Sequence, residues 1–306
     1  MTAARSFVSF PPLAVALTVL LLAARTTWAQ GPDVPFVPTP SVVVDAMLEL
    51  AGVGPNDYVM DLGSGDGRIV IAAAKQRGAR GSGVDVDGTL VSEARRLAQR
   101  QGVADRVEFK LDNLLYTDIK RATVVTMYLY PRLMLQMRPR LVAELAPGAR
   151  IVSHEFEMEP WQPDARVTVP VPDKPYGAPY SEVLLWIVPA DAGGVWQWRM
   201  AIGTAAVNYE VTLSQAFQKL SGTAVIGGNS GRFDGGGMRG AEIRLSLTAD
   251  VGGRVLRHEF SGRVNGDNIK GIVKLDGAGE LEWNATRVRS GRKSVNGERR
   301  LVNSAI

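Results

Sequence analysis

Apolar residues between positions 41 and 190 follow two spacings that alternate along the sequence. Helical spacing, with apolar residues three or four positions apart, follows Ser41 and Arg68 and continues through Leu90 to Ala98. Short apolar runs that are typical of buried strands occupy residues 58–62, 81–86, 107–111, 122–129 and 149–156. Strands that alternate with helices in this way predict a parallel sheet with crossover helices, which is an α/β fold.

Three local features refine this prediction. Ser41 precedes the first helix, where its hydroxyl is expected to cap the free N–H groups. A further helix is expected between the last two strand runs, and Pro139 predicts a break or kink in it near Arg138. The stretches around Val167 and at 183–188 are expected to complete the sheet.

The pattern changes after residue 190. Short alternating runs separated by Gly and Asn predict a smaller antiparallel β-domain over residues 191–306. Its strands are expected at 196–202, 208–213, 242–248, 256–264, 269–275 and 281–286. The glycine-rich segment 227–240 is expected to be a mobile hairpin loop. A phosphate-cradling role is the second interpretation of this segment, although no helix start follows it.

The first 29 residues have the pattern of an export signal. Arg5 supplies a positive start, residues 13–24 form an apolar stretch, and Thr27-Trp28-Ala29 matches a small-residue cleavage site. The apolar stretch is shorter than the roughly 18 residues of a membrane-spanning helix, which favours a removed signal over a retained anchor. We therefore expect an exported protein, periplasmic or secreted, with no transmembrane segment in the mature chain. The proline-rich residues 30–40 predict an extended lead-in.

Composition narrows the possible chemistry. The 306 residues include no cysteine, which excludes disulfides, a thiolate zinc site and a cysteine nucleophile. Much of the net charge of +4 comes from a C-terminal tail that we expect to be solvated rather than a binding patch, and no nucleic-acid partner is expected. The basic residues of this tail are Arg287, Arg289, Arg292, Lys293, Arg299 and Arg300.

The segment 61–68 (DLGSGDGR) lies where a buried strand ends and a helix begins, which is where ligands bind in parallel α/β sheets. Glycines at 63, 65 and 67 allow a sharp turn and a close approach to a ligand, because they have no Cβ. A dinucleotide fingerprint needs glycine where Arg68 stands, which disfavours nicotinamide or flavin binding. Asp61 and Asp66 would repel a pyrophosphate but attract a cation, such as the amino group of a methionine moiety.

An acid followed by GxGxG after the first strand resembles the class I S-adenosylmethionine-dependent methyltransferases. The resemblance implies a Rossmann-like methyltransferase sheet with flanking helices over residues 41–190, and S-adenosyl-L-methionine as the cofactor. It also implies that Asp61, Gly63 and Gly65 surround the methionine part of the cofactor. The remaining loop residues assigned to the cofactor are Ser64, Asp66 and Gly67.

Acidic and amide residues follow the next two strands. Asp85 stands at the end of the second strand, where a carboxylate can accept both ribose hydroxyls. Asp87 is the alternative, but strand alternation favours Asp85. Asp112 and Asn113 follow the third strand, where the family usually places a polar residue near the adenine. The other interpretation is that this pair only caps the next turn.

A narrower resemblance rests on four segments: PTPSVVVDAML, DLGSGDGRIVIAAAK, YLYP and PGARIVSHEFEMEPW. They are similar to the bacterial relatives of the small lysine methyltransferases that act on the mitochondrial ATP synthase c-subunit. This resemblance covers less than half of the chain, and it implies a protein lysine as a candidate methyl acceptor.

Methyl transfer from a sulfonium is an in-line displacement, so catalysis depends mainly on alignment. A lysine acceptor must first lose a proton, which costs roughly 4–5 kcal/mol at neutral pH, and an aromatic, apolar channel would reduce that cost. Tyr128 and Tyr130 are candidates for this channel, and they share a side only if their strand continues. The pair His154-Glu155, with Trp161 beyond it, is a candidate to orient the acceptor or take its proton. The other interpretation of the two tyrosines is that they only pack in the core. The other interpretation of His154 is a structural role.

Three functions remain open from the sequence. The first is an S-adenosylmethionine-dependent methyltransferase that acts on a protein lysine amine. The second is an exported binding protein with an inactive Rossmann-like half and a ligand- or partner-binding β-domain, which the export signal favours because the cofactor is made in the cytosol. The third, an NAD-dependent oxidoreductase, needs the glycine spacing that Arg68 disrupts.

Overall fold

The computed structural model describes residues 36–290, except 176 and 277–278. The predicted export signal (1–29) and residues 30–35 of the predicted lead-in lie outside the described residues, as do Arg292, Lys293, Arg299 and Arg300. Within the described part, none of the helices has the length and hydropathy needed to cross a lipid bilayer.

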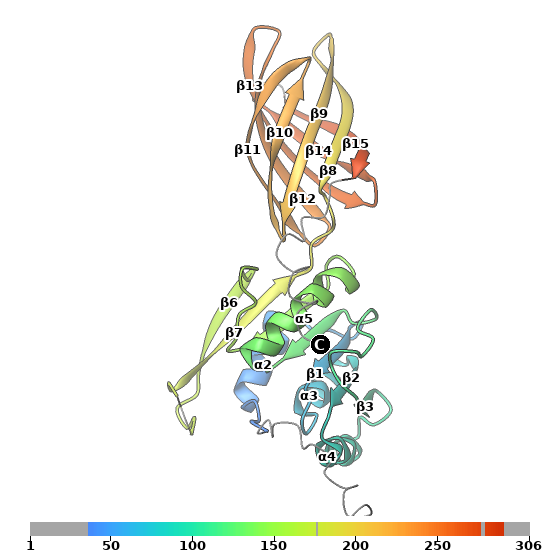
Figure 1. The fold of residues 1–306 in the computed structure, drawn as a ribbon, viewed down its shortest axis with the longest axis vertical. Coiled ribbons are helices and arrows are strands. Elements are labelled where there is room, and N and C mark those ends of the chain that lie inside the picture. The colour runs from blue at the N-terminus through green and yellow to red at the C-terminus, as the bar shows by residue number, and fades with distance from the viewer. Residues whose placement is uncertain (1–35, 176, 277–278, 291–306) are drawn as a thin grey trace, which may run out of the picture. The chain divides into compact units, whose positions relative to one another are not determined.

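Seven strands form the first sheet, in the order β3-β2-β1-β4-β5-β7-β6 (Figure 1). Strands β1 to β5 pair in parallel, whereas β7 runs antiparallel to both β5 and β6. The chain passes from β1 to β2 and β3 on one side and returns to β4 and β5 on the other, so the sheet has a switch point beside β1. The bounds are β1 Tyr58–Leu62, β2 Arg80–Asp85, β3 Val107–Leu111, β4 Val124–Met127, β5 Arg150–His154, β6 Ala165–Pro170 and β7 Tyr180–Ile187.

Helices flank this sheet, which confirms the predicted α/β fold (Figure 1). Their bounds are α2 Ser41–Leu50, α3 Arg68–Arg77, α4 Gly88–Arg100 and α5 Pro131–Glu144. Because successive strand residues point to opposite faces, neighbouring residues of β1 belong to different cores. Val59 lies in one buried cluster with residues of α2 and α3, and Met60 lies in another with residues of α5.

The predicted serine cap of α2 is wrong. The helix begins at Ser41 itself, Pro40 occupies the capping position, and no side chain makes a capping hydrogen bond. The Pro40 carbonyl accepts hydrogen bonds from the N–H groups of Val43 and Val44 at 3.0 Å each. Pro40 therefore starts the helix through its backbone.

Of the break or kink predicted at Pro139, the break is wrong, because α5 continues through this residue, and the kink stays a prediction. Met134 and Met137 before the proline and Leu141 after it are all buried. Proline removes one donor from the helix, and the packing of this apolar face on the sheet outweighs that loss.

Eight further strands form a closed antiparallel barrel, in which each strand pairs with the next along the chain and β15 pairs with β8 (Figure 1). The predicted antiparallel β-domain is confirmed, whereas its closure is a feature that the sequence pattern does not predict. Strand β7 ends at Ile187 and β8 begins at Gly194, on either side of the predicted domain boundary. The bounds are β8 Gly194–Ile202, β9 Ala205–Ala216, β10 Lys219–Ile226, β11 Asn229–Arg239, β12 Glu242–Val251, β13 Arg254–Asn265, β14 Asn268–Leu275 and β15 Gly279–Ser290.

The prediction of a mobile loop over residues 227–240 is wrong. Gly227 and Gly228 form a turn, with φ of 60° and 86°, Gly240 begins the next turn, and the residues between them are β11. A Cβ at Gly236 would lie 2.9 Å from Leu245 Cδ2, so this glycine makes room for a packed neighbour. Gly236 therefore serves close packing within a strand.

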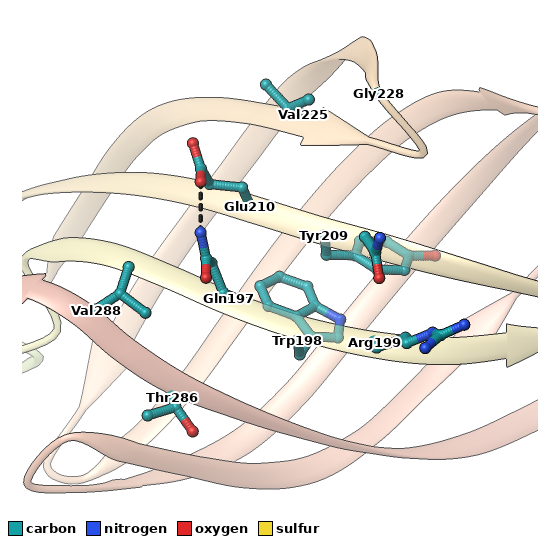
Figure 2. A pocket seen from close by; sticks show the side chains of 10 residues that line it. Gln197, Trp198, Arg199, Tyr209, Glu210, Val225, Gly228, Thr286 and Val288 are labelled. Carbon is teal, nitrogen blue, oxygen red and sulfur yellow. Dashed lines mark hydrogen bonds between the residues drawn. The ribbon is translucent and has the colours of Figure 1, made fainter.

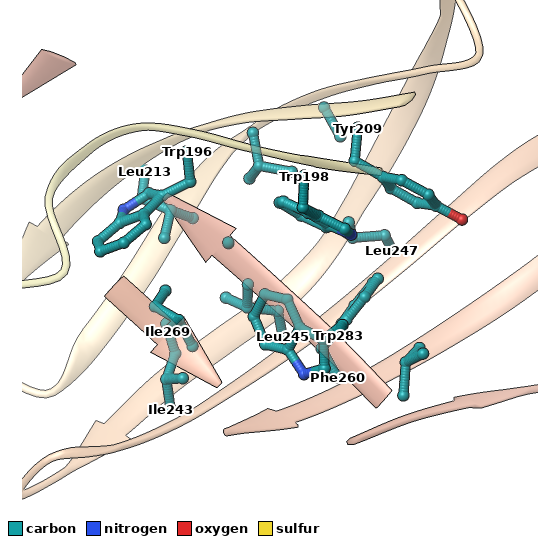
Figure 3. Close-up of a cluster of buried hydrophobic side chains, with 14 of the residues drawn as sticks. Trp196, Trp198, Tyr209, Leu213, Ile243, Leu245, Leu247, Phe260, Ile269 and Trp283 are labelled. Carbon is teal, nitrogen blue, oxygen red and sulfur yellow. The ribbon is translucent and has the colours of Figure 1, made fainter. Parts of the chain in front are cut away.

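Figure 3 shows the aromatic centre of the barrel interior. Trp198 stacks on Tyr209 with ring centroids 4.9 Å apart, and it lies 5.1 Å from Trp283 and 5.3 Å from Phe260. These separations lie within the range that favours aromatic pairs. His258 is fully buried beside Tyr209, and burial lowers its pKa. This histidine is therefore part of the barrel core.

The expectation that Arg287 belongs to a solvated tail is wrong. The residue lies in β15, its side chain is 5% exposed, and its guanidinium is 4.6 Å from the centroid of the Trp196 ring. It donates hydrogen bonds to the carbonyls of Asp191, Gly193 and Gly266 at 2.5, 2.6 and 3.2 Å. Arg287 therefore ties three segments together where β15 meets β8.

Arg287→Ala should lower the free energy of unfolding by about 2–3 kcal/mol, because it removes hydrogen bonds from a charged donor to three carbonyls and the contact with Trp196. Urea unfolding followed by tryptophan fluorescence measures this change. The matched control is Arg289→Ala, which removes an exposed arginine from the same strand and should be nearly neutral. Equal effects of the two variants would contradict the structural role of Arg287.

Candidate functional site

The side chains that the sequence singles out gather at one edge of the first sheet. Asp61, Asp85 and His154 lie in the last residues of β1, β2 and β5, and Asp112 and Tyr128 directly follow β3 and β4. The carboxyl ends of parallel strands share one edge, and ligands of such sheets bind at this edge beside a switch point. The candidate site therefore lies where the loop from β1 enters α3.

A concave surface lies on the barrel (Figure 2). Residues of β8, β9 and β15 line it, and Gln197 donates a 2.7 Å hydrogen bond to Glu210 between two of these strands. None of the residues that the sequence singles out lines this pocket. We therefore place the candidate site at the edge of the sheet.

The loop after β1 has backbone φ angles that glycine adopts more readily than other residues. Gly63, Gly65 and Gly67 have φ of 82°, 52° and 79°, in the left-handed region. The N–H groups of Gly63 and Ser64 both donate to the Val84 carbonyl at 2.9 Å, which fixes the loop against β2. A Cβ at Gly63 would lie 2.9 Å from Leu129 Cδ2, so this loop lies directly against the segment that follows β4.

Asp85 connects this loop to the end of β2. Its Oδ2 accepts the N–H of Gly65 at 2.8 Å, and its Oδ1 accepts the N–H of Asp87 at 3.0 Å. An ionised carboxylate has about four acceptor sites, so Asp85 can accept two further hydrogen bonds. Asp87 instead caps α4, where it accepts the N–H groups of Thr89 and Leu90. The two acids thus have different roles, and the one that faces the loop is Asp85.

Asp61 is 2% exposed and accepts a 2.8 Å hydrogen bond from Thr126 Oγ1. Burial raises the pKa of its carboxyl to about 7, and the negative charges of Asp85 and Asp66 contribute to the increase. The group is therefore close to its ionisation point at neutral pH. A cationic ligand nearby would favour its charged form.

Asp66 has a partner within the chain. Arg68 Nε and Nη2 donate to its two carboxylate oxygens at 2.9 and 2.6 Å, and Arg68 Nη1 donates to the Thr39 carbonyl at 3.0 Å. A two-pronged pair of this kind fixes both geometry and charge. The contact of Asp66 with the cofactor stays a prediction, and the structural pair with Arg68 is a role that sequence reasoning missed.

The pair after β3 makes local hydrogen bonds. Asn113 Oδ1 accepts the N–H of Leu115 at 2.9 Å, and Asp112 Oδ1 accepts the N–H of Asn113 at 2.8 Å. These bonds agree with the turn-capping interpretation, and a contact with adenine stays a prediction. Val86 and Leu111, exposed by 70% and 62%, flank the same strand ends. Sequence reasoning missed both, although each is an apolar residue next to an acid at a strand end, which is a usable signal.

The two tyrosines after β4 are in different surroundings. The strand ends at Met127, so the condition for a shared side is not met. Tyr128 is half-buried, with its ring centroid 4.0 Å from that of His154 and 6.2 Å from that of Phe156. Tyr130 is 48% exposed and precedes the first residue of α5. The structure therefore joins Tyr128, but not Tyr130, to an aromatic group at the end of β5.

His154 is enclosed by polar partners. It is 1% exposed, its Nδ1 is 3.3 Å from Thr39 Oγ1, and its Nε2 is 2.9 Å from Ser181 Oγ. Burial lowers the pKa of the imidazole to about 4, so the ring is neutral at physiological pH. Such a ring is a poor acceptor for a proton from an amine. The geometry favours the orienting interpretation of His154 over the proton-accepting one.

Glu155 lies in a tight turn at the same strand end. Its φ is 71°, and the N–H of Phe156 donates to the His154 carbonyl at 3.0 Å across it. Burial alone would raise the pKa of the Glu155 carboxyl, but Lys174, whose Nζ lies 2.5 Å away, and Ser181 outweigh burial and lower it. Glu155 is therefore ionised and its charge is balanced by Lys174. Sequence reasoning missed this pair.

Known proteins are similar in sequence to the part of the chain that contains this sheet. The family model for the ANTKMT methyltransferase domain matches residues 61–165. A protein-lysine N-methyltransferase from Saccharolobus islandicus is 44% identical over 139 residues, which are 45% of this chain and 86% of that protein. The chain belongs to this methyltransferase family. The predicted class I S-adenosylmethionine-dependent methyltransferase is confirmed, and so is its cofactor.

More distant relatives match a similar part of this methyltransferase. The human ATP synthase c-subunit lysine N-methyltransferase is 34% identical over 130 residues, which are 42% of this chain and 55% of that protein. The chain thus spans about half the length of this relative. A solved RNA methyltransferase from Salinibacter ruber, in complex with S-adenosyl-L-homocysteine, is 48% identical and has a TM-score of 0.46. The match covers 50% of this chain and 94% of that chain.

The residues at the sheet edge fit the cofactor of the family. Asp85 retains acceptor sites for paired hydroxyls, and Val86 and Leu111 present apolar surface beside it. Ser64 Oγ is buried and has no hydrogen-bond partner among the described residues, so a polar ligand in the loop would satisfy it. The methyltransferase therefore has acidic, apolar and hydroxyl groups where a nucleoside with a cationic tail would lie.

The raised pKa of Asp61 predicts a pH-dependent stability. The pKa of Asp61 in the folded protein, about 7, lies above its ordinary value of 3.8. The contribution of this carboxyl to the free energy of unfolding is therefore fully present below about pH 4 and is lost as the pH rises through 7. Between pH 5 and pH 8 the wild type should therefore lose about 2–3 kcal/mol more than Asp61→Asn. Urea unfolding without cofactor at both pH values measures the difference. Asp105→Asn, on the surface, controls for the lost charge, and equal slopes in all three proteins would refute the prediction.

Proposed function

We propose that this methyltransferase transfers the methyl group of S-adenosylmethionine to a lysine amine of a protein. The observation that carries the proposal is the 44% identity to a protein-lysine N-methyltransferase over 86% of that protein. The aromatic surface at the ends of β4 and β5 supports it, because Tyr128 and Phe156 offer an apolar approach to an alkyl amine.

Different residues at the sheet edge would bind different parts of the cofactor. Asp85 would accept the ribose hydroxyls, Asp61 with the glycine loop would surround the methionine part, and Val86 and Leu111 would flank the adenine near Asp112. When bound, the cofactor supplies an electrophilic methyl group on a positively charged sulfur. The acids of this edge give it a negative field that suits such a cation.

The acceptor side would act mainly by alignment and desolvation. The amine lone pair attacks the methyl carbon, a C–N bond forms as the C–S bond breaks, and S-adenosylhomocysteine leaves. An apolar surface lowers the pKa of an approaching lysine, and the neutral His154 adds no charge that would shift this pKa in either direction. The Glu155 carboxylate is paired with Lys174, so it does not hold the incoming amine in its protonated form.

Export of the chain is a further proposal, and it rests on residues 1–29. A positive start, an apolar stretch and a small-residue site support a removed signal and a periplasmic or secreted location. Cell fractionation with N-terminal sequencing of the recovered protein tests it. A cytosolic protein that retains Met1 would overturn it.

The nature of the acceptor can be read from the methylated product. The purified protein is incubated with methyl-labelled S-adenosylmethionine and, separately, with a protein extract and an RNA extract. Complete hydrolysis and mass spectrometry should show methylated lysine from the protein extract. Label found only in methylated nucleosides would contradict the proposal and favour an acceptor like that named for the Salinibacter ruber relative.

Asp85→Ala should weaken binding of S-adenosylhomocysteine by roughly 1.5–3 kcal/mol, because charge-assisted hydrogen bonds to the ribose are lost. This corresponds to roughly a 10- to 150-fold increase in Kd by calorimetry. The matched control is Asp87→Ala, which loses the cap of α4 and about 1 kcal/mol of stability but should keep its affinity. Unchanged affinity in Asp85→Ala would refute the ribose assignment.

A further inference from the structure

Three segments that are distant in sequence meet at one buried residue. Thr39 precedes α2, Arg68 begins α3 after the glycine loop, and His154 ends β5. Thr39 and His154 are 115 residues apart, yet their side chains lie within 3.3 Å of each other. Each of the three residues belongs to one of the segments on which the narrower resemblance rests, so the structure brings these segments into direct contact.

Thr39 contacts both neighbours through different atoms. Its carbonyl accepts a 3.0 Å hydrogen bond from Arg68 Nη1, and its hydroxyl is 3.3 Å from His154 Nδ1. Thr39 is 4% exposed, and its contact with His154 is buried, whereas the side chain of Arg68 is 36% exposed. Arg68 also holds Asp66 in the glycine loop with two hydrogen bonds. A continuous path of polar contacts therefore runs from the cofactor loop to the imidazole.

The imidazole is fixed on its other sides as well. Ser181 Oγ lies 2.9 Å from Nε2, and the ring of Tyr128 lies 4.0 Å from the imidazole centroid. A neutral imidazole has one donor and one acceptor nitrogen, and each of its two hydroxyl partners can take either role. Thr39 and Ser181 therefore hold the ring at both of its nitrogens, which fixes its tilt against Tyr128.

We propose that Thr39 is a positioning residue that couples the cofactor loop to the acceptor side through His154. A change in the loop on cofactor binding moves Arg68, and Thr39 passes this movement to the imidazole that supports Tyr128. The kinetic part of this inference rests on the proposed methyl transfer. The coupling itself requires only that the loop binds the cofactor. If Thr39 only stabilised the fold, loop and imidazole would respond independently.

The chain allows a direct test because it contains two histidines, His154 and His258. Imidazole NMR spectra of the full chain are recorded with and without S-adenosylhomocysteine. In the wild type the His154 signals should shift on binding, whereas those of His258 in the barrel core should not. Thr39→Ser keeps the hydroxyl and should keep the shift. Thr39→Val has nearly the same shape without the hydroxyl and should lose it.

Unchanged His258 signals report that the barrel of each variant is folded, and bound S-adenosylhomocysteine by calorimetry reports an intact cofactor loop. The inference is overturned if His154 does not respond in the wild type, or if it responds equally in Thr39→Val. If Thr39→Val cannot bind the ligand at all, Arg68→Lys, which loses the forked contact, replaces it and should also lose the shift.

Kinetics supply a second readout that a purely structural role would not give. With a methylated lysine as product, Thr39→Val should lower kcat roughly ten- to a hundredfold, since small misplacements are costly in alignment-driven catalysis, while the Kd for S-adenosylhomocysteine stays within about twofold. Thr39→Ser should restore kcat. If no methylated lysine forms, the proposed function fails while the NMR result stands. If methylated lysine forms without coupling in the spectra, only this inference fails.

Discussion

The bend between β1 and α3 depends on one carbonyl group. Val84 accepts the N–H groups of Gly63 and Ser64 together, and the next residue, Asp85, accepts the N–H of Gly65. Three consecutive residues of the loop are thereby bonded to the end of β2. The left-handed backbone at its glycines is the conformational condition for these bonds. The position of α3, the nearness of Leu129 and the direction of the strand-end acids all follow from this attachment.

Three carboxylates at one edge repel one another, and the structure accommodates each by a different physical means. Burial raises the pKa of Asp61 to about 7, so part of its charge is absent at neutral pH. Arg68 balances Asp66, and backbone N–H groups stabilise the carboxylate of Asp85. The residual negative field is directed at the loop, where a sulfonium nucleoside compensates it. Acidic residues thus select a cationic cofactor rather than a pyrophosphate.

The sequence predicts what depends on local pattern. Strands β1 and β3, the glycine turn and Asp85 follow from periodicity and motif, because these features are set within a few residues. Long-range packing decides the rest. The glycines of β11 suggest a loop in the sequence, and only the structure shows that Gly236 packs against Leu245. In the sequence Arg287 resembles a tail residue, and only the structure shows the three backbone carbonyls to which it donates hydrogen bonds. No local pattern predicts that Thr39 contacts a histidine 115 residues away.

Packing also determines how the side chains at this edge of the sheet can contribute to catalysis. Burial keeps His154 neutral, and Lys174 occupies the one carboxylate next to it, so neither side chain is free to take a proton from an ammonium group. A lysine that reaches Tyr128 must therefore lose its proton as it leaves water, and a surface of aromatic rings favours that loss by excluding solvent. What the chain then contributes is orientation. Orientation requires a fixed imidazole beneath the tyrosine, and that is the arrangement that Thr39 and Ser181 maintain.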